Sequence, residues 1–281
     1  WFPGLIADFD IRALGFEPNN VTFATYRQLT ETLKKAQSSL KLAATNGLVE
    51  SIRTIKEPEE IELITKAVVI ADDAFEYIAD VIHAGMTEME VAWEIEKFMR
   101  EKGSQTIPFD IIVASGPNAA LPHARPSLRT ISSGEPILID IGAWCEGYSS
   151  DLSRTIWLGA ADDKLRGIYD TVLGAQLTAL AIIKEGMTGN EADNVARTVI
   201  EQAGYGEAFG HGLGHGIGLA PHELPRLGPN STDRLTDGTV FTVEPGIYLS
   251  GWGGVRIEDV AVMEEGKPRV ISKARKEYHD K

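Results

Sequence analysis

The chain has 281 residues, of which 43% are hydrophobic and 24% are charged, and its formal net charge is −14. This acidic balance argues against binding to nucleic-acid phosphates, and no apolar run approaches the ~20 residues that span a bilayer, so we expect neither nucleic acid nor membrane as a partner. The single cysteine, Cys145, excludes internal disulfides and cysteine-based zinc sites, which fits a reducing cytoplasm.

Residues 1–52 show few regular patterns. We expect a strand over Val21–Tyr26, a helix over Gln28–Leu42 and a turn at Asn46-Gly47. This is too little for a separate domain, and the chain starts without a Met or a signal-peptide pattern. We therefore interpret residues 1–52 as the C-terminal remnant of a truncated N-terminal domain and residues 53–281 as the catalytic unit.

Two consecutive helices are predicted next. Glu57–Glu59 begins a pattern of apolar residues at helical spacing that continues to Ile82, with a proline in the first turn. Gly85 ends this pattern. The capping-box signature Thr87–Glu90 then begins a second helix, which ends near Gly103.

The same order of features recurs further along the chain. Asp162-Asp163 begins a helix that Gly186 closes, and Thr188–Glu191 repeats the capping box. A strand-like run that ends in an acid follows in each half, Gly134–Asp140 in the first and Gly238–Glu244 in the second. We therefore predict an internally duplicated α+β domain, with two helices and β-hairpins in each half.

Each predicted hairpin carries two acids. Asp140 and Asp151 flank a turn near Cys145, and Glu244 and Glu258 are equidistant from Gly251. Residues equidistant from a turn face each other at about 4.5–5.5 Å between Cβ atoms, and like charges there are destabilising unless a cation lies between them. Pseudo-symmetry would bring both pairs together around metal ions. The alternative is that these acids lie exposed on sheet faces and never meet.

A histidine could complete this set. Glycine occupies every second position of Gly210–Gly218, which excludes a helix, and in a strand His211, Leu213 and His215 would share one face. His215 would then be a fifth ligand. Four carboxylates with one imidazole favour Mn²⁺, with Co²⁺ or Zn²⁺ as alternatives, and we expect two divalent ions about 3.5–4 Å apart.

Several motifs resemble the pita-bread metallopeptidases, which have the creatinase/aminopeptidase fold. They are His215–Gly218, Pro221–Glu223, Val243–Tyr248 and Arg256–Asp259. Ser115–Asn118 and Pro122–Ala124 resemble the proline-specific branch of that family. The resemblance covers residues 53 to about 270, and residues 1–52 resemble the end of that branch's N-terminal domain.

The resemblance implies roles for ten residues. The metal ligands are Asp140, Asp151, His215, Glu244 and Glu258, of which Glu244 also moves a proton. His123 and His222 bind substrate and stabilise the tetrahedral intermediate, while His211 is an outer histidine and Arg256 holds ligand carboxylates. Arg226 would bind the carboxylate of a dipeptide, because its planar guanidinium suits that group; the alternative is a surface arginine without a role.

These residues predict hydrolysis of the bond before proline in small peptides. We favour an Xaa-Pro dipeptidase (prolidase), with aminopeptidase P, which acts on longer Xaa-Pro peptides, as the alternative. A methionine aminopeptidase, a metal-free relative such as creatinase, and a non-catalytic binding module on the same fold are further alternatives. The resemblance also implies a homodimer.

Overall fold

The computed structural model describes residues 2–9 and 11–276 and divides into two compact units, residues 1–52 and 53–281. The first unit contains α1 (Phe2–Asp8), β1 (Ala13–Phe16), α2 (Phe23–Lys35) and β2 (Lys41–Ala44), and α3 (Leu48–Arg53) follows. Its strands pair in parallel, and its small core includes Phe2, Ile6 and Leu33. The interpretation of this unit as a remnant of a larger domain stays a prediction.

The structure corrects two of the predicted elements in the first unit. Val21–Tyr26 is not a strand, because α2 already begins at Phe23 and Thr22 caps it by accepting a hydrogen bond from the Thr25 amide. The predicted helix over Gln28–Leu42 continues only to Lys35, and β2 follows it. Pairing of β2 with β1 is a non-local contact, which local patterns do not reveal.

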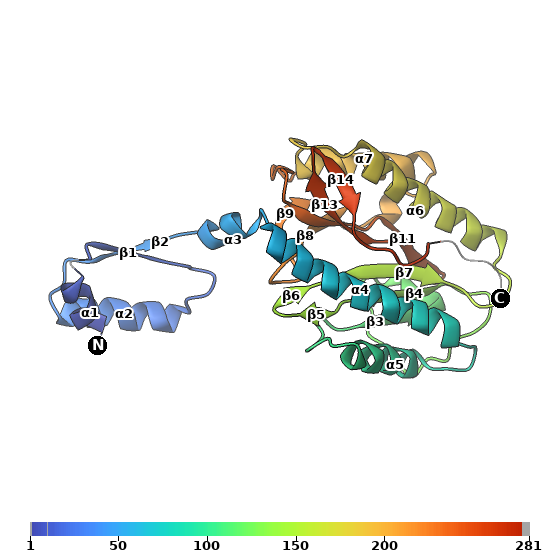
Figure 1. Ribbon diagram of the computed structural model, residues 1–281, viewed down its shortest axis with the longest axis horizontal. Coiled ribbons are helices and arrows are strands. Elements are labelled where there is room, and N and C mark those ends of the chain that lie inside the picture. Colours follow the sequence, from blue (N-terminus) through green and yellow to red (C-terminus); the bar gives the residue numbers. More distant parts are fainter. Residues whose placement is uncertain (1, 10, 277–281) are drawn as a thin grey trace. The chain divides into compact units, whose positions relative to one another are not determined.

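The second unit is an α+β domain built from two similar halves, as predicted (Figure 1). The first half contains α4 (Pro58–Val81), α5 (Glu88–Glu101), β3 (Ile112–Ser115), the 3₁₀ helix η1 (Gly116–Ala120), β4 (Ile137–Ile141), β5 (Trp144–Cys145), β6 (Tyr148–Ser149) and β7 (Leu152–Ile156). The second half contains α6 (Asp163–Ile182), α7 (Gly189–Gln202), η2 (Gly206–Ala208), β8 (Gly214–Gly216), β9 (Glu223–Leu227), β10 (Val240–Val243), β11 (Gly246–Leu249), β12 (Gly253–Arg256), β13 (Asp259–Glu264) and β14 (Lys267–Val270).

Both predicted capping boxes are present. The Thr87 and Thr188 side chains each accept a hydrogen bond from the backbone of the third helical residue, whose glutamate side chain accepts one from the threonine backbone. A third box at Glu57 caps α4, where Pro58 is the first helical residue. The helices therefore begin where the sequence specifies.

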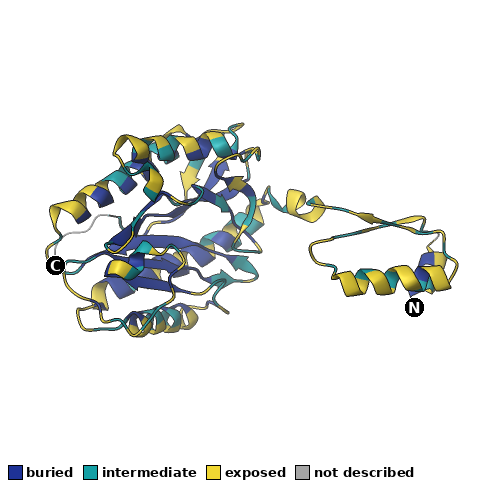
Figure 2. Cartoon of the chain, turned by 180° about the vertical axis from the view of Figure 1, so that it is seen from behind, coloured by how far each residue is buried: buried dark blue, intermediate teal, exposed yellow. Residues whose placement is uncertain are grey.

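The strands form antiparallel sheets at the centre of the second unit. Their orders are β3-β4-β7 and β14-β13-β10-β8-β9, and β11 pairs with β12 and β5 with β6. Figure 2 shows that the strands are largely buried while the helices expose their outer faces. Because β4 and β7 are buried along their whole length, side chains at their ends are held on a rigid base.

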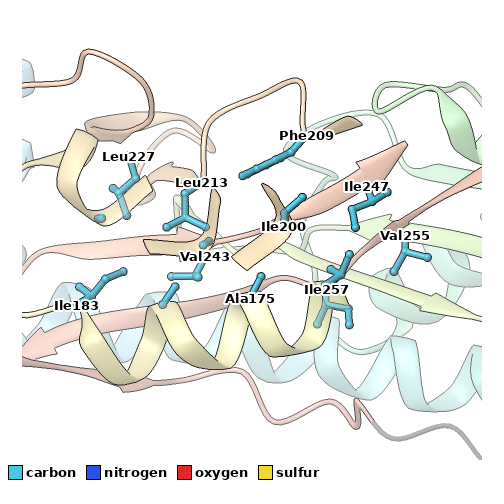
Figure 3. Close-up of a cluster of buried hydrophobic side chains, with 14 of the residues drawn as sticks. Ala175, Ile183, Ile200, Phe209, Leu213, Leu227, Val243, Ile247, Val255 and Ile257 are labelled. Carbon is cyan, nitrogen blue, oxygen red and sulfur yellow. The ribbon is translucent and has the colours of Figure 1, made fainter. Parts of the chain in front are cut away.

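The largest hydrophobic cluster lies in the second half. It joins Ala175 of α6 and Ile183, which follows that helix, to Val243 of β10, Val255 of β12 and the nearby Ile257 (Figure 3). Burying each valine or isoleucine side chain of this cluster stabilises the fold by about 1.5–3 kcal/mol. Within the described part of the chain, no helix is both long enough and apolar enough to cross a membrane.

Candidate active site and metal centre

One cavity of about 690 Å³ brings together every residue for which the sequence predicted a role. These are His123, Asp140, Asp151, His211, His215, His222, Arg226, Glu244, Arg256 and Glu258. They come from both halves of the second unit, as the predicted pseudo-symmetry requires. The alternative in which the acids lie apart on exposed sheet faces is therefore wrong.

The centre of this cavity is a cluster of carboxylates around one imidazole. Asp151, His215 and Glu258 each place a potential ligand atom within 4.8 Å of the others. His215 Nε2 lies 3.3 Å from Glu244 Oε1 and 3.7 Å from Asp151 Oδ2. Groups of this kind at such separations are those that bind divalent metal ions.

The register of the first hairpin differs from the prediction. Asp140 pairs with Ser153 rather than with Asp151, which lies just outside the ladder. The turn is formed by Glu146 and Gly147, both with positive φ, so it is centred one residue later than expected. Side chains two residues apart in a strand point to the same face of the sheet. Asp151 therefore lies on the same face as Ser153 and as its partner Asp140.

The second hairpin has the predicted register. Gly246 pairs with Arg256, and two further steps along both strands lead to Glu244 and Glu258, just beyond the ladder. The Glu258 amide donates to the Ser153 carbonyl at 3.0 Å, which joins the two hairpins beside the acids. The four carboxylates therefore meet where the halves join.

His215 lies on β8, which is much shorter than predicted. The strand covers only Gly214–Gly216, so Leu213 packs in the hydrophobic core while His211 and His215 line the cavity. A Cβ at Gly214 or Gly216 would overlap a backbone carbonyl of a neighbouring strand, so only glycine fits beside His215. The expectation of close backbone approach is thus confirmed, and that of one continuous histidine face is wrong.

The orientation of the His215 ring leaves one nitrogen for a metal. Its Nδ1 lies 3.0 Å from the Gly216 carbonyl oxygen, which can only accept, so Nδ1 carries the proton. Nε2 faces Glu244 and Asp151, so in the metal-free protein it can carry a second proton toward Glu244, and a metal ion would take the place of that proton. The Thr242 hydroxyl, which the sequence did not single out, accepts from the His215 amide and donates to Glu244.

The electrostatics of the cluster favour a bound cation. Burial, together with the neighbouring carboxylates, raises the pKa of Asp151 and of Glu258 well above their ordinary values. Burial also acts to raise the pKa of Glu244, but the hydrogen bond and charge of His215 lower it to about 2. Among the described residues, Asp140 Oδ1 and Glu258 Oε1 are buried without a hydrogen-bond partner. Such orphaned oxygens fit divalent metal ions.

A hydrogen-bond network around Arg256 holds the carboxylate of Asp140. Arg256 donates to Asp140 Oδ2 at 2.5 Å, to the Ser153 hydroxyl at 2.7 Å and to the Tyr248 hydroxyl at 2.8 Å. Tyr248 in turn lies 2.8 Å from His211 Nε2. Arg256 therefore contacts a candidate ligand, in agreement with its predicted role. Sequence reasoning missed Tyr248 and Ser153, although Tyr248 lies within a motif that carried the resemblance.

Two histidines lie at the cavity surface beside the cluster. The His222 ring centroid is 4.3 Å from that of His215, and partial desolvation with the nearby His215 lowers the His222 pKa. His123 lies on the loop after η1 and is exposed to the same cavity. Both side chains can reach a molecule bound in the cavity. Their roles toward substrate stay predictions.

Comparisons with known proteins agree with this geometry. Residues 62–265 match metallopeptidase family M24. A curated Xaa-Pro dipeptidase from Pyrococcus furiosus is 41% identical over 249 residues, covering 89% of this chain and 72% of that protein.

Solved structures show the same fold. An Xaa-Pro dipeptidase from Bacillus anthracis matches with a TM-score of 0.94 and 45% identity, over 98% of this chain and 76% of that one. An X-Pro aminopeptidase from Thermotoga maritima matches with a TM-score of 0.90 and 38% identity, over 98% and 77% of the two chains. The predicted pita-bread fold is thereby confirmed, and this chain belongs to metallopeptidase family M24.

Proposed function

We propose that this enzyme hydrolyses the Xaa-Pro bond of dipeptides, as a prolidase does. The observation that carries the proposal is the convergence of all ten predicted residues on one cavity, in a chain about 40% identical to proteins named Xaa-Pro dipeptidase. Small proline-containing peptides are then its substrates.

The proposed cofactor is a pair of divalent metal ions held by Asp140, Asp151, His215, Glu244 and Glu258. When bound, such ions lower the pKa of a water molecule and polarise the scissile carbonyl. Carboxylates dominate the donor set, and Asp140 Oδ1 and Glu258 Oε1 are buried without other partners among the described residues. This supports a hard or borderline ion, and we propose manganese, with cobalt or zinc able to replace it.

The remaining steps are assigned to the chain's own side chains. His222 and His123 would donate hydrogen bonds to the oxygen of the scissile carbonyl as it gains negative charge. Glu244 would accept the proton of the attacking water and pass it to the proline nitrogen as that nitrogen leaves. Proline has no amide hydrogen, so shape and apolar contact would select it.

Arg226 supports the choice of a dipeptidase. It pairs with His215 across β8 and β9, and residues that pair in a ladder direct their side chains to the same face. Its backbone is fixed at both ends, since its amide donates to Asp233 and its carbonyl accepts from Ser231. Arg226 lines the cavity, and within the described part of the chain its guanidinium makes no ion pair. A positioned, unpaired guanidinium in the cavity suits the free carboxylate of a dipeptide.

The test compares a dipeptide with a longer peptide of the same first two residues. Arg226→Ala should raise KM for an Xaa-Pro dipeptide by about tenfold or more, because a charge-assisted pair contributes roughly 1.5–3 kcal/mol, and should affect an Xaa-Pro tripeptide much less. Arg269→Ala removes an exposed arginine outside the cavity and serves as the control. Equal effects on both substrates would contradict the role of Arg226.

Aminopeptidase P activity is the second candidate, because an X-Pro aminopeptidase shares this fold with a TM-score of 0.90. Faster cleavage of tripeptides than of dipeptides by the unaltered enzyme would favour it. We further propose a homodimer in the cytoplasm, on the resemblance and on the single cysteine. Light scattering of the purified protein tests the dimer.

A further inference from the structure

Glu223, the neighbour of His222, is a buried carboxylate with cationic partners. Its side chain is 7% exposed and accepts a hydrogen bond from Lys56 Nζ at 3.1 Å, and it forms an ion pair with Arg53. It also accepts from the Ala220 amide at 2.9 Å, which closes the bend before His222. The Lys56 side chain is only 2% exposed, so this pair is shielded from water.

The surrounding backbone is shaped around this carboxylate. A Cβ at Gly218 would lie 2.8 Å from Glu223 Oε2 and 3.0 Å from Lys56 Cε, so a larger residue there would displace the pair. The Lys56 backbone amide donates to the Gly238 carbonyl at 2.9 Å, so the backbone that carries the Lys56 side chain is held in place. Breaking a buried pair by removing one partner is strongly unfavourable, so its geometry is firmly held.

His222 needs such support more than the other cavity histidines on its half do. The His211 and His215 rings each place Nδ1 against a carbonyl oxygen, at 2.8 and 3.0 Å. Among the described residues, the His222 ring makes no hydrogen bond, and its aromatic neighbour is the His215 ring. Its position is therefore determined by its backbone, and Glu223 holds that backbone.

We propose that Glu223, through its pair with Lys56, is the positioning residue that places His222 in the cavity. The proposal rests on the proposed function, in which His222 contacts the substrate. Glu223 does not touch the reacting atoms, and its carboxylate is occupied by Lys56, Arg53 and the Ala220 amide. Displacing His222 by a fraction of an ångström would weaken its hydrogen bond to the developing charge, while the candidate metal ligands stay in place.

The first experiment replaces Glu223 by an uncharged side chain of the same shape. Glu223→Gln should lower kcat for an Xaa-Pro dipeptide by about 10- to 100-fold, change KM much less and leave the bound metal content unaltered. The matched control is Glu146→Gln, because Glu146 also pairs with a lysine, Lys66 of α4 at 3.6 Å, but with both side chains exposed. The control should retain the kcat of the unaltered enzyme.

A double-variant cycle separates positioning from a general structural effect. If Glu223 acts by placing His222, Glu223→Gln should have almost no further effect on kcat in a His222→Ala background. Equal fold-losses of kcat in both backgrounds would overturn the proposal. In the metal-free protein, the NMR signals of the His222 ring should shift in Glu223→Gln and not in Glu146→Gln; an unmoved His222 signal would also overturn it.

A further variant covers the case in which Glu223→Gln does not fold. Lys56→Met/Glu223→Gln leaves no unpaired ammonium at Lys56 and should fold while showing the same loss of kcat. Normal kcat in a folded double variant would overturn the proposal. Failure of the proposed function is distinguishable, because it would appear as absent Xaa-Pro hydrolysis by the unaltered enzyme, while the NMR comparison still reports on His222.

Discussion

The two halves of the second unit use the same main-chain contacts to attach a loop to a helix. In the first half, the Glu88 amide at the start of α5 donates to the Arg129 carbonyl at 3.1 Å. In the second, the Gly189 amide at the start of α7 donates to the Asp233 carbonyl at 2.8 Å. The segments that end at these bonds carry His123 on a loop in one half and Arg226 on β9 in the other.

The side chains at these equivalent positions differ completely. The Glu88 carboxylate is fully buried and accepts hydrogen bonds from Ser115, Asn118 and Ser127, which hold the loop before and after His123. At Gly189 there is no room for a side chain, because a Cβ would overlap the Arg226 carbonyl oxygen. One half thus anchors its loop with a buried carboxylate and the other with direct backbone packing. The main-chain contacts are therefore the same in the two halves, while the side chains at the equivalent positions differ.

The two halves also contribute different ligands to the candidate metal site: the first contributes two aspartates, and the second contributes one histidine and two glutamates. Removing an aspartate of the first half tests this assignment and has the largest expected effect. Asp151→Ala should abolish activity and lose at least one metal ion while the fold survives, because Asp151 lies within 4.8 Å of ligand atoms from the second half. Elemental analysis and circular dichroism check this. Asp170→Ala, at an exposed position on α6, is the control. Full metal occupancy with near-normal turnover would contradict the assignment of Asp151.

His222 belongs to the second half but is proposed to act on the substrate rather than on the metal. His222→Ala should leave the metal content unchanged and lower kcat by about 10²–10³, as expected for loss of a donor to a developing oxyanion. Metal analysis beside steady-state kinetics measures both quantities. A variant that loses metal would show that the roles of His215 and His222 have been exchanged.

The difference between Glu88 and Gly189 predicts a smaller effect on stability. Gly189→Ala should lower the free energy of unfolding by about 1–3 kcal/mol, because the added methyl group would lie 2.7 Å from Ser231 Oγ and closer still to the Arg226 carbonyl. Gly167→Ala is the matched control, since Gly167 is exposed on α6 with no atom within 4 Å of an added Cβ, and it should stabilise by up to about 1 kcal/mol. Equal effects of both changes on urea unfolding would contradict this account.

The sequence predicted those features that local chemistry determines. The capping boxes at Thr87 and Thr188 and the register around Gly251 agree with the structure, because a cap or a tight turn depends on a few adjacent residues. The convergence of the acids followed from duplication, since two similar halves place equivalent residues at their common boundary.

Other features required contacts that local patterns do not contain. The pairing of Asp140 with Ser153 depends on where the Glu146-Gly147 turn is centred, and a shift of one residue in the turn moves the partner by two. The parallel pairing of β1 with β2 joins segments about 28 residues apart, so the predicted helix wrongly included Lys41 and Leu42 of β2. Tyr248 was missed because its function comes from Arg256 and His211, which it contacts only after folding.

The most direct test of the account measures metal content and substrate choice on one preparation of the unaltered enzyme. The protein is loaded with Mn²⁺, freed of excess metal, analysed for bound manganese and assayed with an Xaa-Pro dipeptide, an Xaa-Pro tripeptide and a methionyl peptide without proline. We predict two ions per chain and fastest cleavage of the Xaa-Pro dipeptide, by analogy with two-metal peptidases. Hydrolysis of the methionyl peptide in preference, or no metal bound at all, would contradict the central claim that this cavity is a dinuclear Xaa-Pro dipeptidase site.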